Sequence, residues 1–312
     1  MSGRDEWDAW EADWMLSLEG RPKAPQASTL KIYRQGLANL VEWARANGYE
    51  DPHDLDTRAM RRYFAHFRER KHKQTGEPIS PAYIRRDYTS LVQWFKFLAA
   101  EGDRPGYVNP MTLIPTPVIE PKRIEILRPE ELRALLRACE GTGFAERRDT
   151  ALLRLLMDAG PRRGEIMSMT VADVDLPRRE VTLEGKTGER VVGIGVKTAE
   201  ALSRYLRARG RHKDSGLDEL WLVAAPHRGA MGRDSLRLML NRRAGEAHVD
   251  NVHPHRFRHT AFDMFQEDGG EDTTAMDRFG WSTRSMLDIY GRSNRERRSI
   301  RVAHRLASSD KI

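Results

Sequence analysis

The sequence predicts a mainly α-helical protein with a small antiparallel β-sheet, divided into two domains. Apolar residues recur at helical spacing over most of the chain, prolines crowd residues 103–126, and two β-like runs flank a turn at residues 185–189. A length of 312 residues suits two domains, because domains usually hold about 100–200 residues. We expect a helical domain over residues 1–102, a linker over residues 103–126 and a mixed domain over residues 127–312.

The first domain is expected to be a bundle of four or five helices with one arginine-rich face. One helix follows Ser28 and Thr29, which can cap it, and a second covers residues 58–73. A third starts after the serine–proline pair at residues 80–81. Their apolar faces are predicted core: Leu30, Tyr33, Leu37, Leu40, Val41, Met60, Tyr63, Phe64, Phe67, Tyr83, Ile84, Tyr88, Leu91, Val92, Phe95 and Leu98.

The linker is predicted to be an extended connector. Proline removes a backbone hydrogen-bond donor and biases the residue before it away from helix. Five prolines fall in this segment: Pro105, Pro110, Pro115, Pro117 and Pro121.

The second domain combines helices with one β-hairpin. Pro129 opens a helix, and a second helix is predicted at residues 149–159. The β-like runs at residues 180–184 and 190–195 form the hairpin, with Lys186 in its turn. Further helices are predicted at residues 198–209, 235–247, 259–267, 285–289 and 294–306.

The charge distribution favours a nucleic-acid partner. The chain has 53 Lys and Arg against 46 Asp and Glu, a formal net charge of +7. Basic residues concentrate at residues 58–73, where only Glu69 opposes them, and again at residues 292–305. Such residues can serve solubility alone on a solvated helix face, but two concentrated basic segments favour nucleic acid over other polyanions.

Composition excludes several other classes. No apolar run approaches the roughly 18 residues of a membrane span, and the acidic N-terminus lacks a signal-peptide pattern. The single cysteine, Cys139, excludes an internal disulfide framework and a cysteine-rich zinc site. We therefore expect no membrane partner and a soluble cytoplasmic protein, associated with the nucleoid where its partner is DNA.

Four local patterns contain residue types that carry chemistry. They are GPRRGE at residues 160–165, the hairpin turn, HRFRHT at residues 255–260, and a GW pair at residues 280–281 followed nine residues later by a tyrosine. Taken singly, each has an ordinary explanation, such as a surface lysine, a packing tyrosine or an arginine paired with Glu165. The residue types in these patterns that can take part in chemistry are arginine, lysine, histidine, tryptophan and tyrosine.

A metal site at the histidines is not expected. His253, His255 and His259 are close enough in sequence to share a cation, but Arg256 and Arg258 lie between them and would repel it. No cysteine or carboxylate cluster joins them.

Together, two arginines, a lysine, a histidine and a tyrosine suit phosphoryl transfer without a metal. A phosphodiester attacked by an oxygen nucleophile gains charge on its non-bridging oxygens, which guanidinium groups bind with pairs of hydrogen bonds. A tyrosine oxygen can attack in line and hold the phosphate covalently, and a lysine or histidine can protonate the leaving alkoxide.

With these motifs in this order, the chain resembles the tyrosine recombinases of the phage integrase family. Residues 10–102 are similar to the family's core-binding (SAM-like) domain and residues 127–306 to its catalytic domain. GPRRGE resembles the first arginine box, G-L-R-x-x-E, with Pro161 in place of leucine, and HRFRHT resembles H-x-x-R-H-T. The hairpin turn, EGKTGER at residues 184–190, is one residue tighter than the form G-K-G-x-K-x-R that is common in the family. Trp281 replaces the more frequent histidine, and its N–H can donate to a phosphate oxygen without transferring a proton.

The resemblance implies a mechanism. Tyr290 attacks the scissile phosphate, forms a 3′-phosphotyrosine and releases a 5′-hydroxyl, while Arg162 and Arg258 bind the non-bridging oxygens. Lys186 protonates the leaving oxygen, and His255 assists proton transfer at the tyrosine. The hydroxyl then attacks the phosphotyrosine of the partner strand, so that a Holliday junction forms and resolves without ATP, metal or other cofactor.

The resemblance also implies partners. The two domains would form a C-shaped clamp around double-stranded DNA, as a homotetramer on synapsed inverted-repeat core sites, with a C-terminal exchange tail. The first core-binding helix begins within about 20 residues of Met1, which favours the simple two-domain type, and the resemblance allows an accessory directionality factor. The predicted DNA-binding residues are Arg58, Arg61, Arg62, Arg68, Lys71, Lys73, Arg85 and Arg86.

Two other functions stay open on the sequence. A metal-dependent nuclease fits Asp175 and Glu184-x-Lys186, which mimic the D…(E/D)-x-K pattern, but it leaves both arginine boxes unexplained. A non-catalytic DNA-binding regulator would use the same clamp, but it would not need the whole catalytic set.

Overall fold

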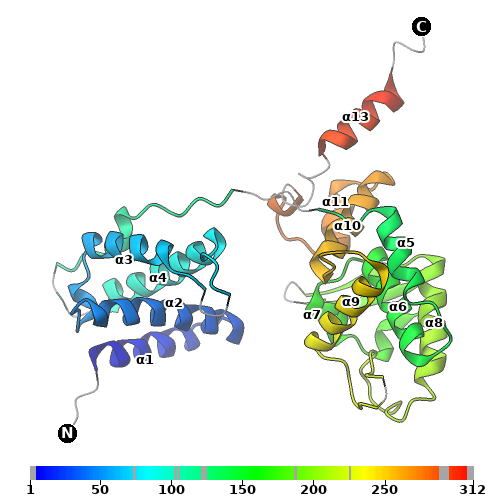
Figure 1. The fold of residues 1–312 in the computed structure, drawn as a ribbon, viewed down its shortest axis with the longest axis horizontal. Helices are drawn as coiled ribbons and strands as arrows, with labels where there is room; N and C mark the ends of the chain where they lie inside the picture. Colours follow the sequence, from blue (N-terminus) through cyan, green and yellow to red (C-terminus); the bar gives the residue numbers. More distant parts are fainter. Residues whose placement is uncertain are drawn as a thin grey trace. The chain divides into compact units, whose positions relative to one another are not determined.

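The computed structural model has two compact units, residues Met1–Pro121 and Lys122–Ile312. It describes residues 5–72, 75–101, 104, 106–120, 125–185, 188–224, 226–287 and 295–307. Most of these residues are helical, and three short strands form one antiparallel sheet (Figure 1). The predicted fold class, mainly α with a small antiparallel sheet, is confirmed. No helix of the described chain combines the length and the apolar character that crossing a membrane requires.

The first unit is a helical bundle around an aromatic core. The side chains of Trp14 and Trp94 meet edge to face in this core, with 5.2 Å between ring centroids. Asp56 caps α3, since its carboxylate accepts a hydrogen bond from the backbone N–H of Ala59 at 2.7 Å. The helices are α1 (Glu6–Glu19), α2 (Ala27–Ala46), α3 (Thr57–Glu69) and α4 (Pro81–Glu101), with a 3₁₀ turn η1 at Pro52–Asp54.

Three predictions for this unit are wrong. Helix α2 begins at Ala27, so Ser28 and Thr29 lie inside it, and Gln26 at its N-cap makes no side-chain capping hydrogen bond. Helix α3 ends at Glu69 and not at residue 73, because the chain becomes extended at Arg70 and pairs with residues 77–79. The linker is not extended throughout, since Pro110–Leu113 forms a 3₁₀ turn, η2. Proline suits the first position of such a turn, and the side chains of Met111 and Ile114, which follow it, are buried in the core of the first unit.

The second unit combines a three-stranded sheet with helices. Strands β1 (Val174–Asp175), β2 (Glu180–Gly185) and β3 (Gly188–Gly193) pair antiparallel in that order, and Gly185 pairs with Gly188 at the hairpin turn. The predicted hairpin is confirmed. The helices are α5 (Pro129–Arg137), α6 (Phe144–Asp158), α7 (Arg163–Ser168), α8 (Val196–Arg209), α9 (Arg233–Ala247), α10 (Pro254–Glu267), α11 (Asp272–Phe279) and α13 (Arg295–Leu306), with a 3₁₀ turn η3 at Val171–Asp173.

The helix predictions for this unit are largely confirmed, with differences at the ends. Helix α6 begins at Phe144, five residues earlier than expected, and α7 and α11 were not expected at all. The helix expected at residues 285–289 is helical over residues 285–287, and its last two residues lie outside the described chain.

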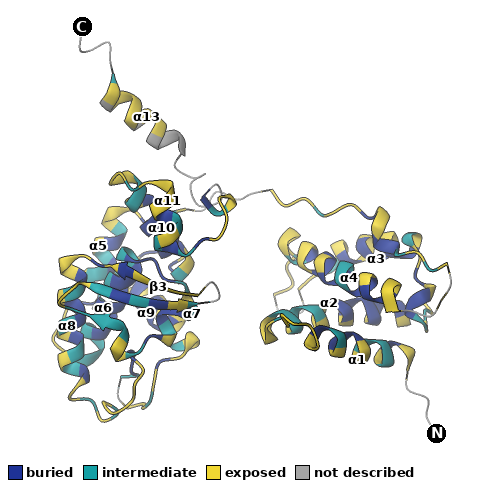
Figure 2. Cartoon of the chain, turned by 180° about the vertical axis from the view of Figure 1, so that it is seen from behind, coloured by how far each residue is buried: buried dark blue, intermediate teal, exposed yellow. Residues whose placement is uncertain are grey.

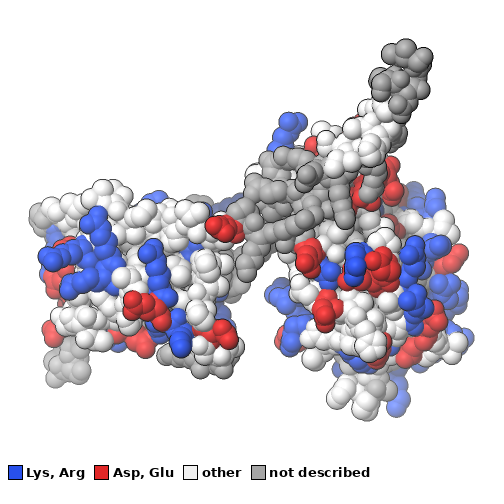
Figure 3. All heavy atoms as spheres, turned by 45° about the horizontal axis from the view of Figure 1, so that its top comes forward, with Lys and Arg blue, Asp and Glu red and all other residues white. Residues whose placement is uncertain are grey.

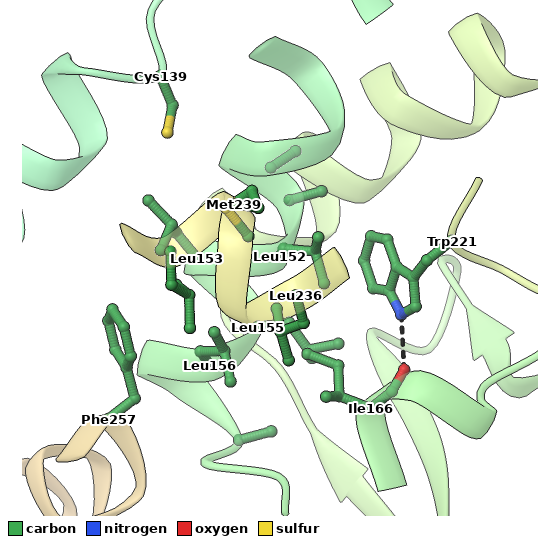
Figure 4. Close-up of a cluster of buried hydrophobic side chains, with 14 of the residues drawn as sticks. Cys139, Leu152, Leu153, Leu155, Leu156, Ile166, Trp221, Leu236, Met239 and Phe257 are labelled. Carbon is green, nitrogen blue, oxygen red and sulfur yellow. Dashed lines mark hydrogen bonds between the residues drawn. The ribbon is translucent and has the colours of Figure 1, made fainter. Parts of the chain in front are cut away.

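The main core of the second unit lies among α6, α9, α10 and the sheet (Figures 2 and 4). Leucines of α6 pack here against Met239 of α9 and Phe257 of α10. Trp221 contributes its ring and donates its indole N–H to the carbonyl oxygen of Ile166 at 2.7 Å, which ties α7 to this core. Helix α10 packs on α6 and α11, β2 contacts α7, and β3 contacts α11. These contacts bring the motif segments together.

A buried carboxylate joins α6 to α9. Asp149, which is fully buried, accepts hydrogen bonds from Arg148, Arg242 and Arg243 at 2.7–3.0 Å. The side chains of Arg148 and Arg243 are buried as well. Without the carboxylate their charges would be left in a poorly solvated site.

We expect Asp149→Asn to destabilise the second unit by about 3–5 kcal/mol, the cost of removing one partner from a buried ion pair. Thermal and urea unfolding followed by circular dichroism would measure it. Asp175→Asn is the matched control, because that carboxylate is half exposed and lies 3.9 Å from Arg178, so its loss should cost under about 1 kcal/mol. An equal loss of unfolding free energy in Asp149→Asn and Asp175→Asn would contradict the stabilising role of the buried carboxylate.

Candidate active site

Three carbonyl oxygens at the C-terminal end of α11 each accept a hydrogen bond from a different arginine. The oxygen of Arg278 accepts from Nε of Arg190 at 3.0 Å, and the oxygen of Gly280 accepts from Nη2 of Arg162 at 2.9 Å. The oxygen of Phe279 accepts from Nη2 of Arg258. The last carbonyls of a helix lack partners within it and carry its negative dipole end, so they suit guanidinium groups. The structure therefore brings together the two arginines that the motifs predicted.

Two motif glycines allow this close approach. Gly160 has φ +54°, and a Cβ there would lie 2.8 Å from Cε1 of Phe279 and 3.0 Å from Cβ of Ala261. Gly280 has φ +59°, and its Cβ would lie 3.0 Å from Nη1 of Arg190. Any side chain at either position would be strained, and it would press on the ring of Phe279 at Gly160 and on the guanidinium of Arg190 at Gly280.

Glu165 holds two of the three arginines. Its carboxylate accepts from Nη1 of Arg162 at 2.7 Å and from the backbone N–H of the same residue at 2.7 Å, as α7 begins. It also accepts two hydrogen bonds from Arg190, at 3.0 and 2.8 Å. Burial raises the pKa of this carboxyl, but Arg190 and Arg162 outweigh that effect and bring the pKa to about 2. The carboxylate is therefore ionised throughout the physiological range.

Arg258 lies deep in the site. It is 1% exposed, and its Nη1 donates to the carbonyl oxygen of Gly160 at 2.9 Å. Its guanidinium carbon lies 5.4 Å from the ring centroid of Phe279 and 5.5 Å from that of Trp281, within cation–π range. Trp281 is buried and stacks on Phe279 at 5.2 Å. Arg162, whose side chain is 34% exposed, is the more accessible arginine of the pair.

The two histidines of the second motif lie one turn apart on α10. Their Nε2 atoms are 3.2 Å apart, and the His255 ring is exposed while that of His259 is buried. Burial lowers the pKa of His255, and His253 and Arg258 lower it further. Burial, His255 and Arg258 lower the pKa of His259 to about 3. Both rings are thus neutral near pH 7, and a neutral imidazole can accept a proton.

The geometry bears on the two metal sites considered from the sequence, one at the histidines of α10 and one at Asp175 and Glu184. Nδ1 of His253 accepts a hydrogen bond from the backbone N–H of Arg256 at 3.2 Å and caps α10. Asp175 pairs with the first residue of β2, whereas Glu184 lies four residues further along that strand, roughly 13 Å away at ~3.3 Å per residue. Across the described chain, no three His, Cys, Asp or Glu side chains are grouped to hold a metal ion.

Two predicted catalytic residues, Lys186 and Tyr290, lie outside the described residues. Arg162, His255, Arg258 and Trp281 lie within them, on the connected elements α7, α10 and the end of α11. Sequence reasoning missed Arg190 as a site residue. The signal was its position in the turn motif EGKTGER, where it matches the final arginine of the common form.

The predicted DNA-binding residues of the first unit are exposed on α3, on α4 and in the segment after α3, except Lys73, which lies outside the described residues. Arg86 lies over the Tyr83 ring, with 4.4 Å between its guanidinium carbon and the ring centroid. Together with Arg70 and Lys71 it lines an open groove of about 400 Å³. Figure 3 shows Lys and Arg side chains on the visible side of this unit, with Asp and Glu side chains between them.

We expect Glu165→Gln to destabilise the protein in a pH-dependent way. The folded pKa of about 2 lies below the ordinary value of 4.5, so the stability from the carboxylate is fully present above about pH 4.5. It is lost as the pH falls toward 2. The difference in unfolding free energy between wild type and variant should be about 3 kcal/mol near pH 7 and shrink below pH ~4.5.

Urea unfolding of both proteins over this pH range would measure that difference. Glu189→Gln, at an exposed position of β3, is the control and should stay within about 0.5 kcal/mol of wild type. A difference that does not change as the pH falls would contradict the assignment.

Comparisons with known proteins show which family the chain belongs to. The model of the phage integrase family matches residues 125–297. Tyrosine recombinase XerC of Xanthomonas campestris pv. campestris (strain B100) is 26% identical over 266 residues, covering 85% of this chain and 78% of that protein. The fold is similar to that of XerH site-specific recombinase bound to a palindromic difH substrate, with TM-score 0.69, 16% identity, and coverage of 88% of this chain and 79% of that chain. It is also similar to that of a lambda integrase tetramer bound to a Holliday junction, with TM-score 0.67, 16% identity, and coverage of 91% of this chain and 76% of that chain. Because the family model spans more than half of the 312 residues and includes both arginine motifs, the chain belongs to the phage integrase family.

Proposed function

We propose that this protein is a site-specific DNA recombinase that cuts and rejoins DNA strands through a 3′-phosphotyrosine and a Holliday junction. The observation that carries the proposal is the convergence of Arg162 and Arg258 on the end of one helix, beside Trp281. Fixed guanidinium groups around one point are what a phosphodiester requires as it gains charge in the transition state. The curated relatives named tyrosine recombinase XerC support the same reaction class.

The residues divide the work of strand cleavage. Arg162 and Arg258 bind the non-bridging oxygens, since their positions are already fixed by carbonyl oxygens and little reorganisation is needed on substrate binding. Tyr290 supplies the nucleophilic oxygen, and Lys186 protonates the 5′ oxygen that leaves. His255, exposed and neutral near pH 7, takes the proton of the tyrosine.

Trp281 completes the binding site for the phosphate. Its ring stacks on Phe279 and lies next to the guanidinium of Arg258, so its orientation is fixed by packing. From there the indole N–H donates to a phosphate oxygen, but it does not exchange protons near neutral pH. No step of this strand-cleavage reaction requires ATP, a metal ion or another cofactor.

The two rival functions have less support. The metal-dependent nuclease needs Asp175 and Glu184 on one cation, and their separation along the sheet disfavours it. A non-catalytic regulator would have no use for two arginines held in one place by a buried carboxylate and three backbone carbonyls. Cleavage that persists in EDTA would separate the recombinase from the nuclease.

We expect Tyr290→Phe to bind its DNA site with unchanged affinity and to form no covalent complex on a nicked suicide substrate, because only the attacking oxygen is removed. Wild type should form the complex, with EDTA present or absent. Denaturing gels of labelled DNA would detect it. Tyr33→Phe, which removes the hydroxyl of a half-buried packing tyrosine in the first unit, is the control and should form the adduct normally. An adduct with Tyr290→Phe would refute the nucleophile.

The first unit binds duplex DNA through its basic face, and both units act on the same duplex. The exposed residues of α3 and α4 and the groove beside Arg86 supply phosphate contacts without reading the sequence. XerH was solved on a palindromic site and lambda integrase as a tetramer on a Holliday junction. By analogy, this protein acts as a homotetramer on inverted-repeat core sites, at the nucleoid, and an accessory directionality factor would fit this scheme.

The tail after residue 294 is the element that links protomers. Helix α13 exposes Ile300, Val302 and Leu306, apolar side chains that a neighbouring protomer could cover. Exchange of this tail would couple placement of the nucleophile to assembly of the tetramer.

We expect the double substitution Arg85→Gln and Arg86→Gln to weaken DNA binding and to lower the slope of log K against log salt by about 2, since each phosphate contact contributes about 0.9. Fluorescence anisotropy across a salt series would measure the slope. Lys23→Gln, at an exposed residue between α1 and α2, is the control and should leave it unchanged. A slope unchanged in the double variant would remove these two residues from the interface.

A further inference from the structure

We infer that Arg190, on strand β3, is a positioning residue for strand cleavage that acts through Glu165 on Arg162. This inference rests on the proposed recombinase function. Arg190 is not one of the candidate catalytic residues, and its side chain is only 11% exposed. It therefore differs from the exposed basic residues expected to contact DNA.

All three guanidinium nitrogens of Arg190 donate within the protein. Nη1 and Nη2 donate to the two carboxylate oxygens of Glu165, at 3.0 and 2.8 Å, in the paired geometry that fixes both groups in one plane. Nε donates to the carbonyl oxygen of Arg278 at 3.0 Å. One side chain thus connects the hairpin, α7 and the end of α11.

The carboxylate of Glu165 also holds Arg162, so Arg190 fixes the position of Arg162 indirectly, through Glu165. Oε1 of Glu165 accepts from both guanidinium groups, and Oε2 accepts from the backbone N–H of Arg162. The backbone packs tightly on this pair, since a Cβ at Gly185 would lie 2.8 Å from Oε1 of Glu165. The carboxylate has little room to turn while Arg190 is present.

Charge gives Arg190 a second effect. One carboxylate shared by two guanidinium groups leaves a net charge of +1, which is available to a phosphate. If Arg190 were neutral, Glu165 would cancel the charge of Arg162 and weaken its attraction for the non-bridging oxygens. The buried carboxyl would also lose the partner that does most to lower its pKa, and it would begin to take up protons at a higher pH.

The experiment is single-turnover cleavage of a nicked suicide substrate by the full-length chain. Arg190→Met keeps the length of the side chain without its donors, and Arg190→Lys keeps the charge without the paired geometry. We expect the methionine variant to cleave about 10- to 100-fold more slowly than wild type, while its DNA affinity stays within about threefold. The cleavage rate of Arg190→Lys should lie between those of Arg190→Met and wild type.

Two readouts separate positioning from a loss of folding. In Arg190→Met the acidic loss of rate should begin at a higher pH than in wild type, because Glu165 then lacks the partner that does most to lower its pKa and, once protonated, no longer holds Arg162 as a carboxylate. In a double-mutant cycle, Glu165→Gln combined with Arg190→Met should be no slower than the slower single variant, because both changes break one connection. Arg178→Met, at an exposed arginine in the turn between β1 and β2, is the control and should cleave at the wild-type rate.

The outcomes are distinct. Rates for Arg190→Met and Arg190→Lys within threefold of wild type, or fully additive losses in the cycle, would overturn the inference. If the methionine variant unfolds at the assay temperature, the lysine variant and its cycle with Glu165→Gln decide the question. If wild type forms no covalent adduct, the proposed function itself fails. If wild type forms the adduct and the Arg190 variants form it at the same rate, only the role of Arg190 fails.

Discussion

The site is organised around the last carbonyl groups of α11, which receive Arg190, Arg258 and Arg162 at three successive residues. A helix of eight residues is short, yet its free carbonyls and its dipole give it a negative end that cations can share. Guanidinium groups that donate to the backbone keep their own charge, because a carbonyl oxygen does not neutralise them. The protein can therefore hold several cations close together and leave most of their charge for a phosphate.

Buried carboxylates limit the repulsion among these cations. Glu165 serves two arginines in the site, and Asp149 serves three between α6 and α9. In both places the cations outnumber the single carboxylate that joins them. At Asp149 the other charges are met by Glu146, Glu246 and backbone carbonyls, which makes that cluster structural. At Glu165 the excess positive charge lies beside the accessible Arg162, where a substrate can use it.

Much of the fold and part of the site could be predicted from the sequence. Periodicity predicted the helices with long apolar faces and the hairpin, and the resemblance to the phage integrase family predicted that Arg162 and Arg258 share a site. The way they meet could not be predicted, because backbone carbonyls belong to every residue and leave no pattern. Arg190 was missed because one arginine on a strand resembles many others in so basic a chain. The linker was misjudged because its prolines outweighed the two apolar residues, Met111 and Ile114, that anchor part of it in the core.

Anchoring by backbone has a consequence for how this site tolerates change in evolution. Replacing the side chain at residue 278 or 279 leaves the carbonyl oxygen in place, and only the packing of the Phe279 ring on Arg258 and Trp281 restricts residue 279 further. Adding or deleting a single residue within α11 is different, since it would rotate the helix end by about 100° and shift it by about 1.5 Å. All three acceptors would then be turned away from their arginines at once. Across related proteins, the length of this short helix should therefore be kept more strictly than its composition.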